Sequence, residues 1–151
     1  MGLEYDHIGL CVSDLPRAVE FYRDILGMER VGRHILSDNK THQAAYHIGN
    51  LILILFHRPD FKPADPRIHQ GLDHLALTMD GKMFMDVLGK LKARDMVLRG
   101  PYHNSGAFGM GVATYFYDPD YNQIEIKTYD PDVLARFTEE DPGPTTNRHM
   151  A

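Results

Sequence analysis

One hexapeptide pattern occurs twice in this chain, near its start and near its middle. The first copy reads YDHIGL at residues 5–10, and the second reads LDHLAL at residues 72–77. In both, an Asp-His pair precedes an apolar, a small and an apolar residue. The alternation of apolar side chains predicts a β-strand in each copy. His7 and His74 point away from the more apolar side, because successive side chains of a strand face opposite ways.

The repeat continues beyond these two strands. An apolar stripe with helical spacing follows each copy, beginning after Ser13 or Asp14 in the first and after Asp80 in the second. Further strands are expected after each helix, near 28–36, 41–48, 50–57, 96–99, 111–117 and 122–129. A strand, a helix and three strands in the same order predict two tandem βαβββ modules of the α+β class, which form one structural domain.

The boundaries of the two modules follow from the proline-rich stretches. The first module is expected to cover residues 1–57 and the second residues 72–130. Between them lies the sequence RPDFKPADPRIHQG at 58–71, whose three prolines indicate a linker. Residues 131–151 are expected to form an arm or a disordered tail.

Composition excludes several kinds of partner. The chain has 151 residues, 43% of them hydrophobic and 25% charged, with a net charge of −5, which is typical of a soluble globular protein. The sequence contains no run of Lys or Arg residues that would favour nucleic acid as a partner. The longest apolar run, LILILF at 51–56, is too short to span a bilayer. The first residues lack the pattern of a signal peptide, so a cytoplasmic location and no membrane association are expected.

Two histidines and one carboxylate hold matching places in the repeat. If the modules pack about a pseudo-twofold axis, His7 and His74 can meet, and Glu125 comes from the strand that ends the second module. Such a set leaves positions open on a divalent ion for substrate and O₂, and it is also reasonable for zinc. The alternative is that both histidines are satisfied by hydrogen bonds and that Glu125 lies on the surface.

Three stretches of this chain resemble a known family. DHIGLCVSDLPRAVEFYRDILGM (6–28), DHLALTM (73–79) and YFYDPDYNQIEI (115–126) are similar to the vicinal oxygen chelate superfamily of glyoxalases, bleomycin resistance proteins and type I extradiol dioxygenases. The resemblance implies paired modules forming an open, barrel-like mixed sheet around a metal. It places His7, His74 and Glu125 on three ligand positions. It also implies a small-molecule substrate and a homodimer.

The resemblance is nearest to small one-domain dioxygenase-like members. Glyoxalase I and the epimerases carry a fourth ligand on the last strand of the first module. Aligning GNLILI (49–54) with YNQIEI (121–126) puts Leu53 there, and a leucine cannot bind a metal. Fe²⁺ or Mn²⁺ is therefore favoured as cofactor, with Zn²⁺, Ni²⁺ or Co²⁺ as alternatives. His57, on the same strand face as Leu53, either substitutes as a ligand or lies at the exposed strand end.

The same resemblance suggests catalytic residues. Tyr115 matches an acid–base tyrosine of the extradiol dioxygenases, although a strand tyrosine can equally serve packing. His47 and His103 are candidates for a helping histidine, His103 in a glycine-rich loop. The expected activity is that of an oxidoreductase, a dioxygenase that cleaves a catecholic or related vicinal-oxygen molecule.

Other functions remain open from the sequence. A glyoxalase-like lyase or isomerase is the first alternative, and Leu53 counts against it. A metal-free, drug-binding protein of the bleomycin-resistance kind is the second, and the three candidate ligands count against that one. A fosfomycin-type enzyme is a further possibility, but no basic cluster for a phosphonate is evident.

Overall fold

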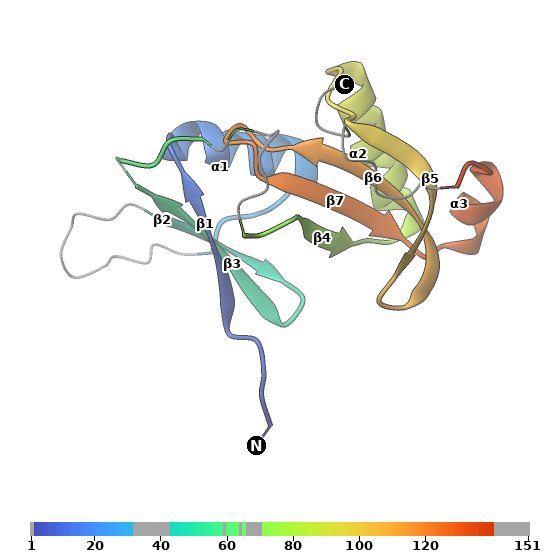
Figure 1. The fold of residues 1–151 in the computed structure, drawn as a ribbon, viewed down its shortest axis with the longest axis horizontal. Helices are drawn as coiled ribbons and strands as arrows, with labels where there is room; N and C mark the ends of the chain where they lie inside the picture. The colour runs from blue at the N-terminus through green and yellow to red at the C-terminus, as the bar shows by residue number, and fades with distance from the viewer. Residues whose placement is uncertain (1, 32–42, 59, 64, 66–70, 141–151) are drawn as a thin grey trace. The chain divides into compact units, whose positions relative to one another are not determined.

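The computed structural model describes residues 2–31, 43–58, 60–63, 65 and 71–140 (Figure 1). The chain divides into two compact units, Met1–Pro63 and Ala64–Ala151, each of which is described by itself. None of the helices within the described residues is long and apolar enough to cross a membrane.

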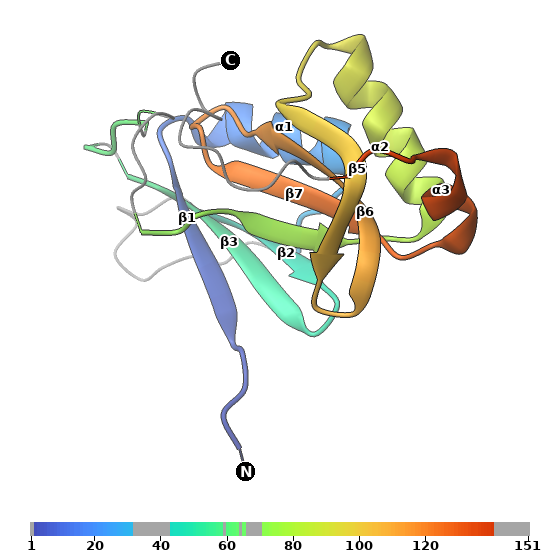
Figure 2. The ribbon, with the colours of Figure 1, turned by 45° about the vertical axis from the view of Figure 1, so that its right-hand side comes forward.

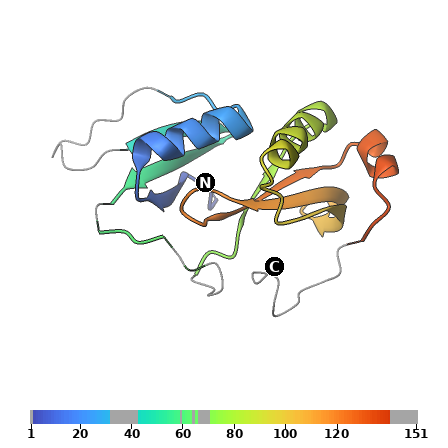
Figure 3. The same ribbon diagram turned by 90° about the horizontal axis from the view of Figure 1, so that it is seen from above.

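The first unit is a three-stranded sheet with one helix. Its elements are β1 (His7–Val12), α1 (Leu15–Leu26), β2 (Gln43–Ile48) and β3 (Leu51–His57). The strand order is β1-β3-β2, with β1 parallel and β2 antiparallel to β3. Figure 3 shows α1 along this sheet. The Asp14 side chain caps α1 by accepting from the Arg17 backbone N–H, and Gly27 ends it in the left-handed conformation.

The second unit repeats this plan with one more strand. It contains β4 (Leu75–Thr78), α2 (Gly81–Ala93), β5 (Arg99–Gly106), β6 (Gly109–Tyr117), β7 (Gln123–Thr128) and α3 (Pro131–Arg136). The strand order is β4-β7-β6-β5, and β4 is parallel to β7 (Figure 2). The buried residues of α2 include the predicted stripe, namely Phe84, Val87, Leu88 and Leu91.

These elements confirm the predicted α+β class and the modular arrangement. Each unit has a strand, a capped helix and then further strands, the last of which pairs in parallel with the first. Within the described residues the two sheets are open and neither closes into a barrel. Most of the strand expected near 28–36 lies outside those residues, as does the part of the tail after residue 140. In the described part of that strand, Arg30 forms an isolated bridge with Tyr46.

Two segments differ from expectation. The stretch 101–111, expected as the glycine-rich loop that holds His103, forms most of β5 and the start of β6, because the hairpin satisfies its backbone groups. Part of the expected tail forms α3, which starts with Asp130 as its cap and Pro131 in its first turn. Both helix-start signals are present in the sequence.

Gly100 allows β5 to lie close to β6. Its φ is +90°, and a Cβ there would lie 2.5 Å from the Ala113 carbonyl oxygen. We expect Gly100→Ala to lower the free energy of unfolding by about 2–6 kcal/mol, since backbone strain and overcrowding each cost roughly 1–3 kcal/mol. Gly89→Ala is the matched control, because a Cβ in mid-α2 meets nothing within 4 Å and should stabilise slightly. Urea denaturation measures both; equal midpoints would contradict the prediction.

Candidate metal centre

One face of the second sheet carries an unusual set of buried polar side chains. The register places Tyr115 and Ala76 on either side of Glu125, and Lys127 follows two residues later on the same strand face. Glu125 and Lys127 are only 5% and 3% exposed. The intervening residues Ile124 and Ile126 face the other way. Charged side chains are seldom buried unless they are paired, so the charged groups on this face are expected to contact one another.

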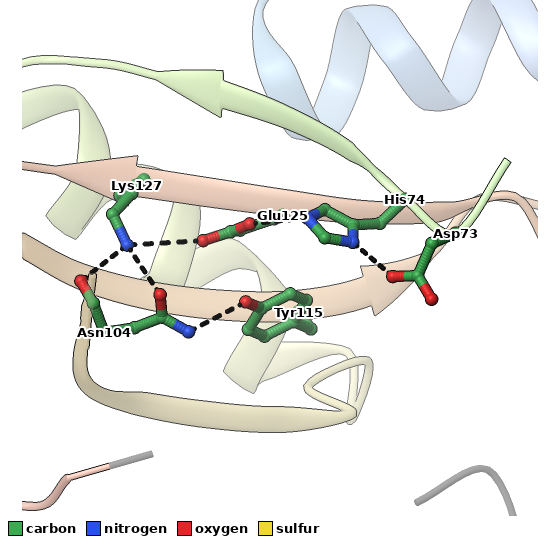
Figure 4. Close-up of polar contacts among 6 residues, drawn as sticks. All are labelled: Asp73, His74, Asn104, Tyr115, Glu125 and Lys127. Carbon is green, nitrogen blue, oxygen red and sulfur yellow. Dashed lines mark hydrogen bonds and ion pairs between the residues drawn. The ribbon is translucent and has the colours of Figure 1, made fainter. Parts of the chain in front are cut away.

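His74 and Glu125 lie in direct contact (Figure 4). His74 precedes β4, and its Nε2 is 3.0 Å from Glu125 Oε2. The other ring nitrogen, Nδ1, bonds to the carboxylate of Asp73. A carboxylate on one nitrogen directs the remaining one towards a metal, as is usual for metal-binding histidines. Two ligand atoms bound at about 2.1 Å and at right angles would themselves be roughly 3 Å apart. The pair therefore fits a divalent ion.

The two side chains shift each other's titration. The hydrogen bond that His74 donates to Glu125 raises the pKa of His74, against the effect of burial, and Asp73 adds to the rise. Burial by itself raises the pKa of Glu125, but the His74 contact and the charge of Lys127 outweigh it and hold that pKa below its usual value. Each side chain therefore stabilises the charged form of the other.

Tyr115 belongs to a ring of polar contacts around Glu125 (Figure 4). Lys127 Nζ donates to Asn104 Oδ1 at 3.0 Å, and Asn104 Nδ2 donates to the Tyr115 hydroxyl at 3.1 Å. A hydrogen bond from Tyr115 helps to keep Glu125 ionised, and Lys127 Nζ lies 3.5 Å from Glu125 Oε1. The ring of Tyr115 is also 5.7 Å from that of His74. The phenol is therefore held beside both candidate ligands.

His7 repeats the arrangement of His74 in the first unit. Its Nδ1 bonds to Asp6, the preceding residue, as the Nδ1 of His74 bonds to Asp73. The other nitrogen, Nε2, is the one that this arrangement would direct to a metal. The shared Asp-His pair thus has the same local geometry in both copies.

Each unit alone provides an incomplete ligand set. In the described parts of the chain, no three His, Cys, Asp or Glu side chains gather closely enough to hold a metal ion. The second unit contributes His74 and Glu125, and His7 belongs to the first unit.

The strand register corrects the expected counterpart of Glu125. In the second unit Glu125 pairs with Ala76, two residues after His74. In the first unit the residue two after His7 is Gly9, and it pairs with Ile54. Ile54 is thus the counterpart, and the alignment that chose Leu53 was wrong by one residue. Leu53 lies in the core with 0% exposure. Isoleucine, like leucine, cannot bind a metal, so the first unit still offers no fourth ligand at this position.

A family model for the Glyoxalase/Bleomycin resistance protein/Dioxygenase superfamily matches residues 4–126. This chain belongs to that superfamily. Its matched region includes both Asp-His pairs, Tyr115 and Glu125. The resemblance inferred from the sequence is therefore confirmed at the level of the superfamily, which includes metalloenzymes.

Individual members of the superfamily show similarity over most of the chain. Virulence protein STM3117 from Salmonella typhimurium is 28% identical over 124 residues, covering 82% of this chain and 83% of that protein. Metallothiol transferase FosB from Staphylococcus haemolyticus is also 28% identical, covering 82% and 81%. A glyoxalase/dioxygenase structure from Nostoc punctiforme is 28% identical with a TM-score of 0.65, covering 83% and 89%. Their names point to more than one activity within the superfamily.

The two helper histidines lie in different places. His47 lies in β2, where it pairs with Ile52, which in turn pairs with His7. His47 and His7 therefore share one face of the first sheet. His103 lies in β5 opposite Val112, on the face of the second sheet that is turned away from Tyr115. Its Nε2 bonds to the Leu134 carbonyl in α3, so the structure does not bring His103 to the candidate centre.

His57 also lies away from the His7 face. It ends β3, on the strand face that Leu53 shares, and it pairs with Val12. Because His7 pairs with Ile52, its side chain lies on the opposite face of the sheet. The register therefore gives no support to His57 as a substitute ligand beside His7.

Sequence reasoning did not find three residues of this face, Arg99, Asn104 and Lys127. One signal was available for Lys127, since the alternation in QIEIKT (123–128) puts it on the strand face of Glu125. Asn104 and Arg99 reach Tyr115 only through the pairing of β5 with β6. That pairing was not predicted, because residues 101–111 were interpreted as a loop and Arg99 only as the end of a short strand.

Proposed function

We propose that this protein is a divalent-metal-dependent enzyme in which His7, His74 and Glu125 hold the ion. The contact between His74 Nε2 and Glu125 Oε2 carries this proposal, together with the Asp73 carboxylate on the other nitrogen. The repeated Asp6–His7 pair supports His7 as the third ligand. Fe²⁺ or Mn²⁺ is the preferred ion, because two imidazoles and a carboxylate are typical ligands of non-haem iron.

We propose further that the substrate is a small molecule with two neighbouring oxygens, most simply a catechol, and that the reaction is a dioxygenation. The bound ion would supply Lewis acidity and redox chemistry. Tyr115, which donates to Glu125 and accepts from Asn104, would give or take a proton at a substrate oxygen. His47 shares the sheet face of His7 and is retained as a helper. The apolar Ile54 supports a three-ligand centre over a glyoxalase-like one.

Anaerobic loading with Fe²⁺, followed by O₂ and a panel of catechols, tests the dioxygenase proposal. The expected result is a coloured ring-cleavage product and O₂ consumption in equal amounts. Turnover of a hemithioacetal without O₂ consumption would favour the glyoxalase-like lyase. Tight binding of small molecules by a protein that takes up no metal would favour the drug-binding alternative. Light scattering in the same preparation would test the proposed homodimer.

A metal-dependent thiol transferase is the second candidate. The relatives named metallothiol transferase are 28% identical to this chain over most of its length. The fold also brings two cations, Arg99 and Lys127, to the Tyr115 face, although the sequence shows no basic run. Incubation of Mn²⁺-loaded protein with fosfomycin and a thiol tests this candidate. Formation of the thiol adduct, with no reaction on catechols, would replace the dioxygenase proposal.

Metal affinity is expected to fall with decreasing pH. A metal ion must displace the proton on His74 Nε2. The pKa of a free imidazole is about 6.5, and that of His74 is raised above it. The proton on His74 therefore competes with the metal ion up to a higher pH than it would on a free imidazole. Binding should therefore be weakest at low pH and level off once pH exceeds that raised pKa. Calorimetry in buffers of different ionisation enthalpy should show that metal binding releases protons at pH 6 and fewer protons as the pH rises. An affinity that does not change with pH would contradict this prediction.

A further inference from the structure

Arg99 is a cation whose donors have few partners. Its guanidinium carbon lies 3.7 Å from the centre of the Tyr115 ring. Two of its nitrogens, Nε and Nη1, are buried and have no hydrogen-bond partner among the described residues. Stacking on an aromatic ring leaves the N–H groups of a guanidinium pointing outwards from its edges.

The contrast with Lys127 shows what Arg99 lacks. Lys127 donates to both oxygens of Asn104 and lies beside the Glu125 carboxylate. No carboxylate in the described part of the chain pairs with Arg99. Its charge does oppose the rise that burial causes in the pKa of Tyr117, but that phenol stays neutral near pH 7. Burying the N–H donors of a charged group without an acceptor costs free energy. An anion bound to Arg99 would supply the missing acceptors and lower that cost.

The strand register puts Arg99 at a useful distance from the candidate ligands. Arg99 pairs with Tyr115, and Tyr115 pairs with Glu125, so the three stand in one row across β5, β6 and β7. Neighbouring strands are about 4.8 Å apart, which puts the backbone of Arg99 roughly 10 Å from that of Glu125. A small molecule built on a substituted ring, or on a chain as long as such a ring, can span the distance between Arg99 and Glu125.

We propose that Arg99 binds an oxyanion group of the substrate, a carboxylate or a phosphonate, while the substrate's other oxygens lie at the metal centre. The placement at the centre rests on the proposed function above; anion binding by Arg99 itself does not. Arginine is suited to this role, because its planar fork matches the oxygens of both groups and stays charged. The substrate class is thereby narrowed to small molecules with an anionic end and a chelating end.

The test follows the Arg99 Nε–H signal by NMR, with the signal assigned through its loss in Arg99→Met. Metal-free and Zn²⁺-loaded protein are titrated with benzoate, phenylphosphonate and the neutral control benzyl alcohol. We expect a saturable shift with at least one anion, in both forms of the protein, and none with the alcohol. The two anions distinguish a carboxylate site from a phosphonate site.

Three variants make the result specific. Because the variants at position 99 lack the Nε–H signal, their anion affinity is measured by calorimetry, with the wild type measured in the same way. Arg99→Met should weaken binding of the effective anion at least tenfold, and Arg99→Lys less, because lysine keeps the charge but loses the planar fork. Arg94→Met, at the exposed end of α2, should bind as the wild type does. The proposal is overturned if neither anion gives a saturable shift, if the alcohol binds equally well, or if both Arg99 variants keep full affinity. Since the metal-free protein is titrated too, failure of the metal centre would be seen separately.

Discussion

Glu125→Gln is expected to remove the metal ion almost completely. The substitution keeps the shape of the side chain, but it replaces a charged ligand oxygen by a weakly binding amide oxygen and removes one of the two carboxylates that contact His74. Changes behind the ligands typically cost about 10–100-fold in metal affinity, and loss of a ligand should cost more. Metal analysis after dialysis should fall from about one ion per chain to near zero.

Two comparisons make the Glu125 result interpretable. Glu20→Gln, an exposed residue of α1, should keep the full metal content. Asp73→Asn should lie between the two, because it weakens only the bond that orients His74. Circular dichroism would show that each variant is folded. A folded Glu125→Gln protein with a full complement of metal would mean that Glu125 is not a ligand.

Tyr115→Phe is expected to lower kcat by about 10²–10⁴-fold while metal content and fold are retained. This is the range by which a positioned acid or base contributes to catalysis. The hydroxyl accepts from Asn104 and donates to Glu125, and the ring still packs against Tyr102 in the variant. Steady-state kinetics on whichever substrate the panel identifies would measure the loss.

A second tyrosine of β6 provides the control for Tyr115. Tyr117 lies on the same strand face, two residues further along, and its ring packs on Tyr121. Tyr117→Phe should leave kcat within a few-fold of the wild type. Equal losses in the two variants would indicate that the Tyr115 hydroxyl has only a structural role.

The parts of the fold that could be predicted are those set by local pattern. The repeated strands and the apolar stripes of α1 and α2 were predicted because periodicity and cap residues are visible along the chain. The exact counterpart of Glu125 was not, because residues 51–56 are apolar on both strand faces. A one-residue slip moves every side chain to the other face, and an unbroken apolar run gives no signal against it.

The candidate site was only partly accessible to sequence reasoning, for the same physical reason. Asp73, His74 and Glu125 stand within or beside strong motifs. Arg99 and Asn104 reach Tyr115 through strand pairing across a hairpin, which depends on the folded sheet. The glycines, proline and asparagine of residues 100–106 do not favour a strand when the segment is taken alone.

Each candidate ligand histidine carries its orienting carboxylate as its immediate neighbour in the chain. In many metal sites such a partner comes from a distant segment and exists only after folding. Here the neighbouring aspartate contacts Nδ1 in both copies and leaves Nε2 as the nitrogen that can bind a metal. A module with this dipeptide at its first strand therefore carries a metal ligand that is already oriented. This holds whether its partner module lies in the same chain or in a second copy. To form the proposed centre, folding then needs only to bring two such histidines and one carboxylate together.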